Sequence, residues 1–356
     1  MATASSERMS EAEVLRRRQS PLRANRVETF LEQLFGGDLH AKRVLSLANA
    51  TTGVLHAGAL SIHLIGLAFA QVEGRNGKHA IKQVDRLLSN YGIDPWKLFE
   101  TWVPFVVGSR DEVVVAMDWT EFDDDEHSVI SLHLVTRHGR ATPLLWSTVP
   151  RSDLKGLRAG HESALLERFK ECLPKDVRVT VLADRGFGDT ALYEHLRELR
   201  MDFVIRFRGD IYVTSSEGET RLACAWVPKN GRALLLRGAG VTANRYRVGA
   251  VALVHAPAMK EAWCLAASST TAGARELVKL YGRRFTIEES FRDTKDARFG
   301  FGMKATHIGN PARRDRLFLI SAFATVLLTL LGAAGERVGL DRLMRANTVT
   351  SAPTGS

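Results

Sequence analysis

Two apolar runs in this chain each end on an aspartate. The run EVVVAMD (112–118) ends at Asp118, and the run VRVTVLAD (177–184) ends at Asp184. Apolar runs of this kind are typical of strands buried in a sheet that helices cover. The sequence therefore predicts an α/β fold in which two carboxyl groups lie at the ends of buried strands.

The segments around these two runs extend the same pattern. Strands are predicted at 128–135, 141–149 and 202–208, and helices at 161–173 and 191–199. Antiparallel strands are thus followed by alternating strands and helices. We expect residues 106–208 to form the first part of an α/β core.

The rest of the chain divides according to its pattern of apolar residues. Apolar stretches without period-two alternation predict a helical region, whereas short β-like runs with Gly-rich breaks predict a β-rich insertion. The predicted divisions outside the first part of the core are a loose basic arm (1–25), a helical region (26–105), a β-rich insertion (209–270), the second part of the core (271–335) and a polar C-terminal tail (336–356).

One apolar segment, LFLISAFATVLLTLLGAAG (317–335), carries no charge and follows three arginines. It could span a membrane, but a single marginal segment rich in Gly, Ala, Ser and Thr favours a helix buried in a protein core. The N-terminus lacks the apolar segment of a secretory signal. We expect a cytoplasmic, nucleoid-associated protein with no membrane partner.

Charge and cysteine content narrow the class of partner. The formal net charge is +9, which favours polyanions such as nucleic acid, although the same balance fits an anionic membrane or mere solubility. The three cysteines, Cys172, Cys224 and Cys264, form no close pair. Neither a disulfide framework nor a zinc site is indicated.

The stretch YGRRFTIEESFRDTK (281–295) predicts a helix with a functional stripe. At the helical period, Tyr281, Arg284, Glu288 and Lys295 fall within about 60° of arc. Glu289 is displaced from Glu288 by about 100° and leaves the stripe. One carboxylate in line with two cations and a phenol indicates a site rather than a solvated face.

Three carboxylates are therefore candidates for one cation site. Asp118 and Asp184 would be costly at the ends of buried strands unless paired or bound to a metal, and Glu288 offers a third ligand. Such oxygen ligands suit Mg²⁺ or Mn²⁺. Taken singly, each could instead be a structural residue in a salt bridge. The acidic run at 123–126 is more simply a solvated turn, and Asp189 a helix cap.

A second basic feature lies in the helical region. In NGKHAIKQVDRLLSN (76–90), Lys78, Lys82 and Arg86 follow one another at four-residue steps and share a helix face. They are candidates for DNA contact. The alternative is a solvated charged face on a packed helix.

The spacing Tyr281-x2-Arg284-x3-Glu288-x6-Lys295 resembles the Y-R-E-K signature of insertion-sequence transposases of the IS-four family, which includes the transposase of transposon Tn-five. Asp118 in AMDWT and the first aspartate in LADRGFGD, Asp184, resemble the first two catalytic aspartates of that family. The segment at 78–90 is also similar to the family's N-terminal region. The resemblance extends over about residues 26–347.

This resemblance implies an RNase H-like catalytic core, interrupted by a β-rich insertion and preceded by an all-helical DNA-binding region. It implies metal-dependent DNA cleavage at element ends and strand transfer into target DNA. Asp118, Asp184 and Glu288 would be the catalytic metal ligands for two Mg²⁺ or Mn²⁺ ions. Two further implications are a homodimer in a synaptic complex, with terminal inverted repeats and target DNA as partners, and DNA phosphate contacts by Tyr281, Arg284 and Lys295, beside those of Lys78, Lys82 and Arg86.

Two points stay open at the level of sequence. In the family, a tryptophan of the insertion can stack on a DNA base, and Trp226 and Trp263 are the candidates, although a tryptophan in a β-rich region is more often a core residue. The chain ends soon after the apolar helix, where some relatives have a dimerisation region. The alternatives to an active transposase are therefore a shortened, non-catalytic copy that acts as a DNA-binding regulator, and a stand-alone RNase H-like nuclease.

Overall fold

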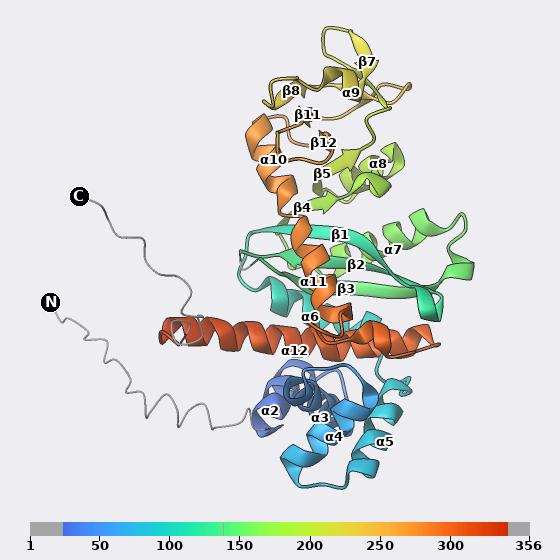
Figure 1. Cartoon of the computed structure of the whole chain (residues 1–356), viewed down its shortest axis with the longest axis vertical. Helices are drawn as coiled ribbons and strands as arrows, with labels where there is room; N and C mark the ends of the chain where they lie inside the picture. The colour runs from blue at the N-terminus through green and yellow to red at the C-terminus, as the bar shows by residue number, and fades with distance from the viewer. Residues whose placement is uncertain (1–23, 138, 341–356) are drawn as a thin grey trace, which may run out of the picture.

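The computed structural model describes residues 24–137 and 139–340. Figure 1 shows an elongated molecule in which the N-terminal helices lie at one end and a small sheet at the other. A larger sheet lies between them, and the long helix α12 (Pro311–Arg337) crosses between this sheet and the N-terminal helices. Most of the predicted basic arm and polar tail lie outside the described residues.

The N-terminal region is helical, as predicted. Side chains start several of its helices: Asn76 accepts a hydrogen bond from the His79 amide, and Asp94 accepts one from the Trp96 amide. Each capping residue has extended backbone dihedrals that end the preceding loop. The helices are α2 (Ala24–Phe35), α3 (Ala41–Ala57), α4 (Ile62–Glu73), α5 (Gly77–Leu88) and α6 (Pro95–Val107).

The larger sheet has eight strands in the order β3-β2-β1-β4-β5-β12-β11-β8. The first three strands form an antiparallel meander, and β4 and β5 then continue the sheet parallel to β1. This agrees with the predicted meander and alternating strands. The strands of this part are β1 (Glu112–Phe122), β2 (His127–Val135), β3 (Ala141–Pro150), β4 (Arg178–Ala183) and β5 (Asp202–Phe207).

The segment predicted as a β-rich insertion divides between two sheets. Three of its strands add antiparallel to the edge of the larger sheet beyond β5, and four form the small sheet in the order β10-β9-β6-β7. The strands are β6 (Tyr212–Thr214), β7 (Thr220–Leu222), β8 (Leu234–Arg237), β9 (Gly240–Val241), β10 (Tyr246–Arg247), β11 (Ala250–Val254) and β12 (Trp263–Ala267), with the short helix α9 (Ala223–Trp226) between β7 and β8.

Helices cover both faces of the larger sheet. One face packs against α10 (Ala274–Gly282) and α11 (Phe285–Lys295), through apolar residues such as Leu277 and Phe291. The other face packs against α7 (Arg158–Cys172), α8 (Thr190–Glu198) and α12. Short 3₁₀ turns complete the chain at Asp123–Asp125, Arg151–Asp153, Arg185–Phe187 and Met303–Ala305.

The apolar segment of α12 is largely a core element. The helix has the length and hydropathy of a membrane span, yet half of its most apolar window is buried in the protein. Leu317 to Ala324 are buried, whereas Leu328, Leu330 and Leu331 are exposed near the C-terminal end of the helix. The predicted core helix thus accounts for the first half of the segment.

The prediction of one continuous helix over 281–295 is wrong. The chain forms two helices, because α10 ends at Gly282 and α11 begins at Phe285. Gly282 is a poor helix former, and the intervening Arg283 and Arg284 make turn-type hydrogen bonds to Leu280 and Tyr281. Both arginines keep right-handed helical dihedrals. The break therefore shifts the stripe without scattering its members.

Candidate active site

Asp118 and Asp184 lie side by side where the parallel pairing of β1 and β4 stops, in the middle of the larger sheet. Strands β1 and β4 are parallel neighbours, and Met117 on β1 pairs with Ala183 on β4. Asp184 follows the last residue of β4, but Asp118 lies within β1, which continues beside β2 to Phe122, so the prediction that this strand ends at Asp118 is wrong. Asp184 also begins the following turn, where its side chain accepts a hydrogen bond of 2.7 Å from the Gly186 amide. Parallel pairing thus brings together two aspartates that are far apart in the sequence.

Glu288 lies on α11, and Arg284 connects it to Asp118. The guanidinium of Arg284 donates a hydrogen bond of 3.1 Å from Nη1 to Oδ2 of Asp118, and Nη2 donates to Oε1 of Glu288. Glu288 is the more accessible partner, with 49% of its side chain exposed against 17% for Asp118. Asp118 and Glu288 thus share one arginine, and Asp184 follows the strand next to Asp118.

Arg284 is an internal counter-ion in this structure. The residue is only 5% exposed, and its guanidinium carbon lies 4.8 Å from the centre of the Phe285 ring. Its Nε is buried and has no hydrogen-bond partner among the described residues. The predicted role of Arg284 as a DNA contact therefore requires that it leave these carboxylates.

The electrostatics of the site reflect crowded negative charge. Burial raises the pKa of Asp118 to about 7, against an opposing effect of Arg284. The carboxylates of Asp184 and Glu288 raise this pKa further, while the Trp119 amide, which donates a hydrogen bond of 2.9 Å to Asp118, lowers it. An additional cation would relieve this crowding.

The donor set fits a divalent ion in chemistry but not yet in arrangement. Three carboxylates are hard oxygen ligands of the kind that Mg²⁺ and Mn²⁺ prefer. Within residues 24–137 and 139–340, however, no three His, Cys, Asp or Glu side chains converge closely enough to hold a metal ion. Arg284 bonds both Asp118 and Glu288 at this point. The candidate ligands are thus near one another, but the Arg284 guanidinium is bound between Asp118 and Glu288.

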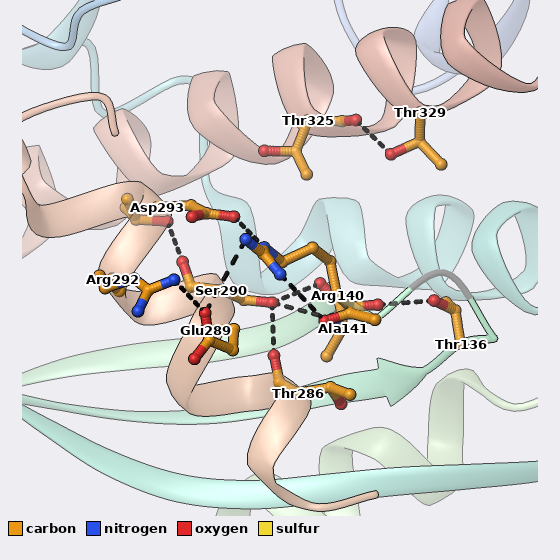
Figure 2. Close-up of polar contacts among 12 residues, drawn as sticks. Thr136, Arg140, Ala141, Thr286, Glu289, Ser290, Arg292, Asp293, Thr325 and Thr329 are labelled. Atoms are coloured by element: carbon orange, nitrogen blue, oxygen red, sulfur yellow. Dashed lines mark hydrogen bonds and ion pairs between the residues drawn. The ribbon is translucent and has the colours of Figure 1, made fainter. Parts of the chain in front are cut away.

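Glu289, the neighbour of Glu288, faces a different part of the molecule. It forms ion pairs with Arg292 and with Arg140 near the start of β3 (Figure 2). On the same side of α11, Ser290 Oγ accepts a hydrogen bond of 2.9 Å from the Ala141 amide. These contacts set the rotation of α11, so that Glu288 and not Glu289 points to the aspartates, in agreement with the helical-period argument.

Tyr281 lies on α10 within the apolar face of the sheet. Its side chain is 1% exposed and packs edge-on against Trp263, with 4.9 Å between ring centres. Trp263 also stacks near Phe285, at 5.9 Å. Trp226 lies elsewhere, where its indole N–H donates to the Val213 carbonyl. Of the two tryptophans left open by the sequence, Trp263 is therefore the one beside the stripe.

Lys295 closes the far end of the stripe. Its ammonium donates hydrogen bonds of 3.0 Å to Thr120 Oγ1 and 2.6 Å to the Glu121 carbonyl. Burial lowers the pKa of Lys295, and the nearby Lys304 adds to this effect. The two lysines share the wall of a cavity of about 290 Å³. Lys295 is thus held beside the strand that carries Asp118.

The basic row of the helical region lies on α5 and faces solvent. Lys78, Lys82 and Arg86 are all exposed, and none of them forms an ion pair within the described part of the chain. Ala80, Val84 and Leu87 on the opposite side are buried. The predicted division of this helix into a basic and an apolar face is confirmed.

A fourth carboxyl group near the site escaped the sequence argument. Glu162 on α7 is 8% exposed and accepts a hydrogen bond of 2.8 Å from the Trp119 indole, next to Asp118. Burial raises the pKa of Glu162, and Asp189 and Asp184 contribute. The available signal was its position three and four residues before Leu165 and Leu166, on the apolar face of the predicted helix.

Two predictions on other acidic residues have different outcomes. Asp189 caps α8, accepting a hydrogen bond from the Ala191 amide, as expected. The acidic run at 123–126 is not simply a solvated turn, because Asp125 pairs with the fully buried Arg314 of α12. The long helix supplied this partner, which no local pattern could indicate.

Comparison with known protein families agrees with this geometry. A family model described as a transposase DDE domain matches residues 110–327, more than half of the chain. A search of curated proteins finds no match. The matched range begins just before β1 and ends within α12, so it contains all three carboxylates of the site.

Proposed function

Because the chain belongs to the DDE transposase family, we propose that it catalyses cut-and-paste transposition, cleaving the ends of an insertion sequence and joining them to target DNA. The observation that carries the proposal is that Asp118 and Asp184 lie on neighbouring strands and that Glu288 shares the Arg284 guanidinium with Asp118. The family match falls on the same segment. The finer similarity to the IS-four family, with its Y-R-E-K signature, is part of this proposal.

The three carboxylates have the role of holding divalent ions, Mg²⁺ or Mn²⁺, two in each site. When bound, such ions activate an attacking water or DNA 3′-hydroxyl and stabilise the leaving oxygen. Asp118, Asp184 and Glu288 would hold these ions together. For the ions to bind, Arg284 has to release Asp118 and Glu288, because it now bonds both carboxylates.

The basic side chains around the site are proposed to contact DNA. Lys295 lies beside the end of β1, where it can pair with a phosphate as a point charge. Arg284, once released, can bind a phosphate bidentately. The Tyr281 hydroxyl would then contact a DNA phosphate as well. Lys78, Lys82 and Arg86 on the exposed face of α5 would hold the element end further from the cut. Two copies of the chain would bring two ends together.

The test uses a duplex that carries the inverted repeats flanking the coding region. With Mg²⁺ or Mn²⁺, we expect cleavage at the repeat ends and a joined product with target plasmid. Asp118→Ala, Asp184→Ala and Glu288→Ala should each abolish both products while end binding persists, and Glu289→Ala should remain active. Cleavage without joining would instead indicate a stand-alone nuclease, and binding without cleavage a regulatory DNA-binding protein.

A further inference from the structure

We infer that Arg284 closes the carboxylate site in the DNA-free protein and that a DNA phosphate takes over its guanidinium, so that DNA binding opens the site to divalent ions. This inference rests on the proposed function. The proposed function assigns the residues that bind metal ions and DNA, and the inference adds that the binding of one is coupled to the binding of the other.

The contacts of Arg284 show what closes the site. One guanidinium bonds Asp118 and Glu288 together, so oxygens that would bind an ion are occupied by N–H donors. The positive charge also opposes a divalent ion at the same place, because like charges repel strongly at short distance. Arg284 and a metal ion held by both carboxylates therefore exclude each other.

The surroundings of Arg284 show why it can leave. It lies in the two-residue break between α10 and α11 and not within a helix. Its Nε is buried without a hydrogen-bond partner among the described residues, which costs free energy in the closed state. Glu288, one of its two anchors, is half exposed. A small change at the break would turn the side chain outward.

A DNA phosphate is the anion suited to receive the released side chain. Guanidinium binds phosphate through paired N–H donors, with geometry similar to its carboxylate contacts. Lys295, held close to Asp118 by Thr120, would bring such a phosphate to this side of the site. DNA and divalent ions should consequently bind with positive coupling, each raising the affinity for the other by the same factor.

The experiment measures Mn²⁺ affinity of the full chain by electron paramagnetic resonance, with and without the inverted-repeat duplex. Arg284→Gln removes the charge and leaves a shorter, neutral polar side chain. Arg283→Gln is the matched control, since it removes the same charge one residue away, where the Arg283 side chain donates a hydrogen bond to the Val135 carbonyl and not to a carboxylate of the site.

We expect Arg284→Gln to bind Mn²⁺ at least about fivefold more tightly than the parent protein without DNA, within the usual range of coupling between two ligands. Arg283→Gln should change the affinity less than about twofold. The increase in Mn²⁺ affinity caused by DNA should be smaller in Arg284→Gln than in the parent, although phosphate oxygens that bind the ion directly retain part of it. Equal Mn²⁺ affinity in Arg284→Gln and Arg283→Gln would overturn the inference.

A failure of the proposed function would look different. If Asp118→Ala binds Mn²⁺ with the stoichiometry of the parent, the carboxylates do not form the metal site, whatever Arg284 does. Should Arg284→Gln not fold, as judged by circular dichroism, side-chain NMR of the parent provides the answer. The Nε–H resonance of Arg284 should shift as Mg²⁺ saturates the site, and an unchanged resonance at saturation would contradict a released arginine.

Discussion

At the scale of single residues, burial raises the pKa of an acidic side chain and lowers the pKa of a histidine. Burial raises the pKa of Asp118 to about 7, and the charge of Arg284 opposes this shift. His133 on β2 shows the reverse case, because it is 3% exposed and packs edge-on against Phe291 of α11. Burial lowers the pKa of His133 to about 3, from 6.5 in an exposed histidine.

The sign of the His133 effect gives a prediction for stability against pH. The folded state keeps His133 neutral, whereas the unfolded state binds a proton below pH 6.5, so stability falls as the pH decreases from 6.5 toward 3. For this group alone, the free energy of unfolding should drop by about 1.4 kcal/mol between pH 7.5 and pH 5.5. Urea unfolding at the two pH values measures this change.

The matched variants separate His133 from the other histidines. His133→Leu should lose most of the decrease, because no group at this position then takes up a proton on unfolding. His79→Gln, at an exposed site on α5, should keep the pH dependence of the parent. An identical pH profile for the parent and His133→Leu would show that His133 is not the titrating group.

At the scale of secondary-structure elements, the rotation of α11 decides which glutamate enters the site. Ser290 is buried and exchanges hydrogen bonds with the backbone of Ala141, its Oγ accepting from the amide and donating toward the carbonyl. Arg140 adds contacts to Glu289 and Asp293 on the same side of the helix (Figure 2). The beginning of β3 thus acts as a support for the helix that carries Glu288.

Removing this support should affect both stability and activity. Ser290→Ala takes away the hydroxyl that bonds the Ala141 backbone, and we expect a loss of about 1–3 kcal/mol in the free energy of unfolding. End cleavage should decrease as well, since α11 is less firmly oriented. Arg292→Ala, on the exposed side of the same helix, should stay within about 0.5 kcal/mol of the parent. Comparable losses in both variants would argue against a specific support at Ser290.

The basic face of α5 gives a second prediction at this scale. Replacing Lys78, Lys82 and Arg86 together by alanine should weaken binding of the inverted-repeat duplex and reduce its salt dependence. Each lost phosphate contact lowers the log-log slope by about 0.9, so three contacts lower it by roughly 2.7. The exposed position of all three residues predicts little change in stability. Fluorescence anisotropy over a salt series measures the slope, and an unchanged slope would make this face merely solvated.

At the scale of the whole molecule, α12 joins the helical region to the sheet through adjacent residues. Asp315 accepts hydrogen bonds from the amide and hydroxyl of Thr148 on β3. Arg316 is 4% exposed and donates hydrogen bonds to the carbonyl of Leu88, the last residue of α5, and to the carbonyl of Ile93 in the turn that follows. The proposed DNA-binding region and the larger sheet are thus connected through one helix (Figure 1).

Breaking the connection at Arg316 should loosen the helical region first. Arg316→Leu leaves two buried carbonyls without their charged donor, and we expect a loss of about 2–4 kcal/mol in the free energy of unfolding. Amide hydrogen exchange should increase more in α5 than in β1 and β4. Arg337→Leu, at the exposed end of the same helix, is the control and should leave exchange unchanged. A uniform increase over the whole chain would mean that Arg316 supports general stability only.

The local pattern of the sequence determined much of this protein by itself. Apolar runs and their periods identified the helical region, the meander and the alternating strands, because burial of one or both faces imposes a period on each element. The position of Asp184 after a buried strand, and the choice of Glu288 over Glu289, followed from the same geometry, whereas the strand that carries Asp118 continues to Phe122. The family match over 110–327 confirms the transposase domain that the resemblance of these motifs implied.

Tertiary structure alone decided which partners these residues have. The pairing of Arg284 with Asp118 and the pairing of Asp125 with Arg314 were visible in no local pattern, because both pairs join residues far apart in the chain. A sequence pattern reports which face of an element is buried, but not which element covers it or which charge is nearest. The energy of a buried charge depends on that neighbour, so the closed state of the site is visible only in the folded protein.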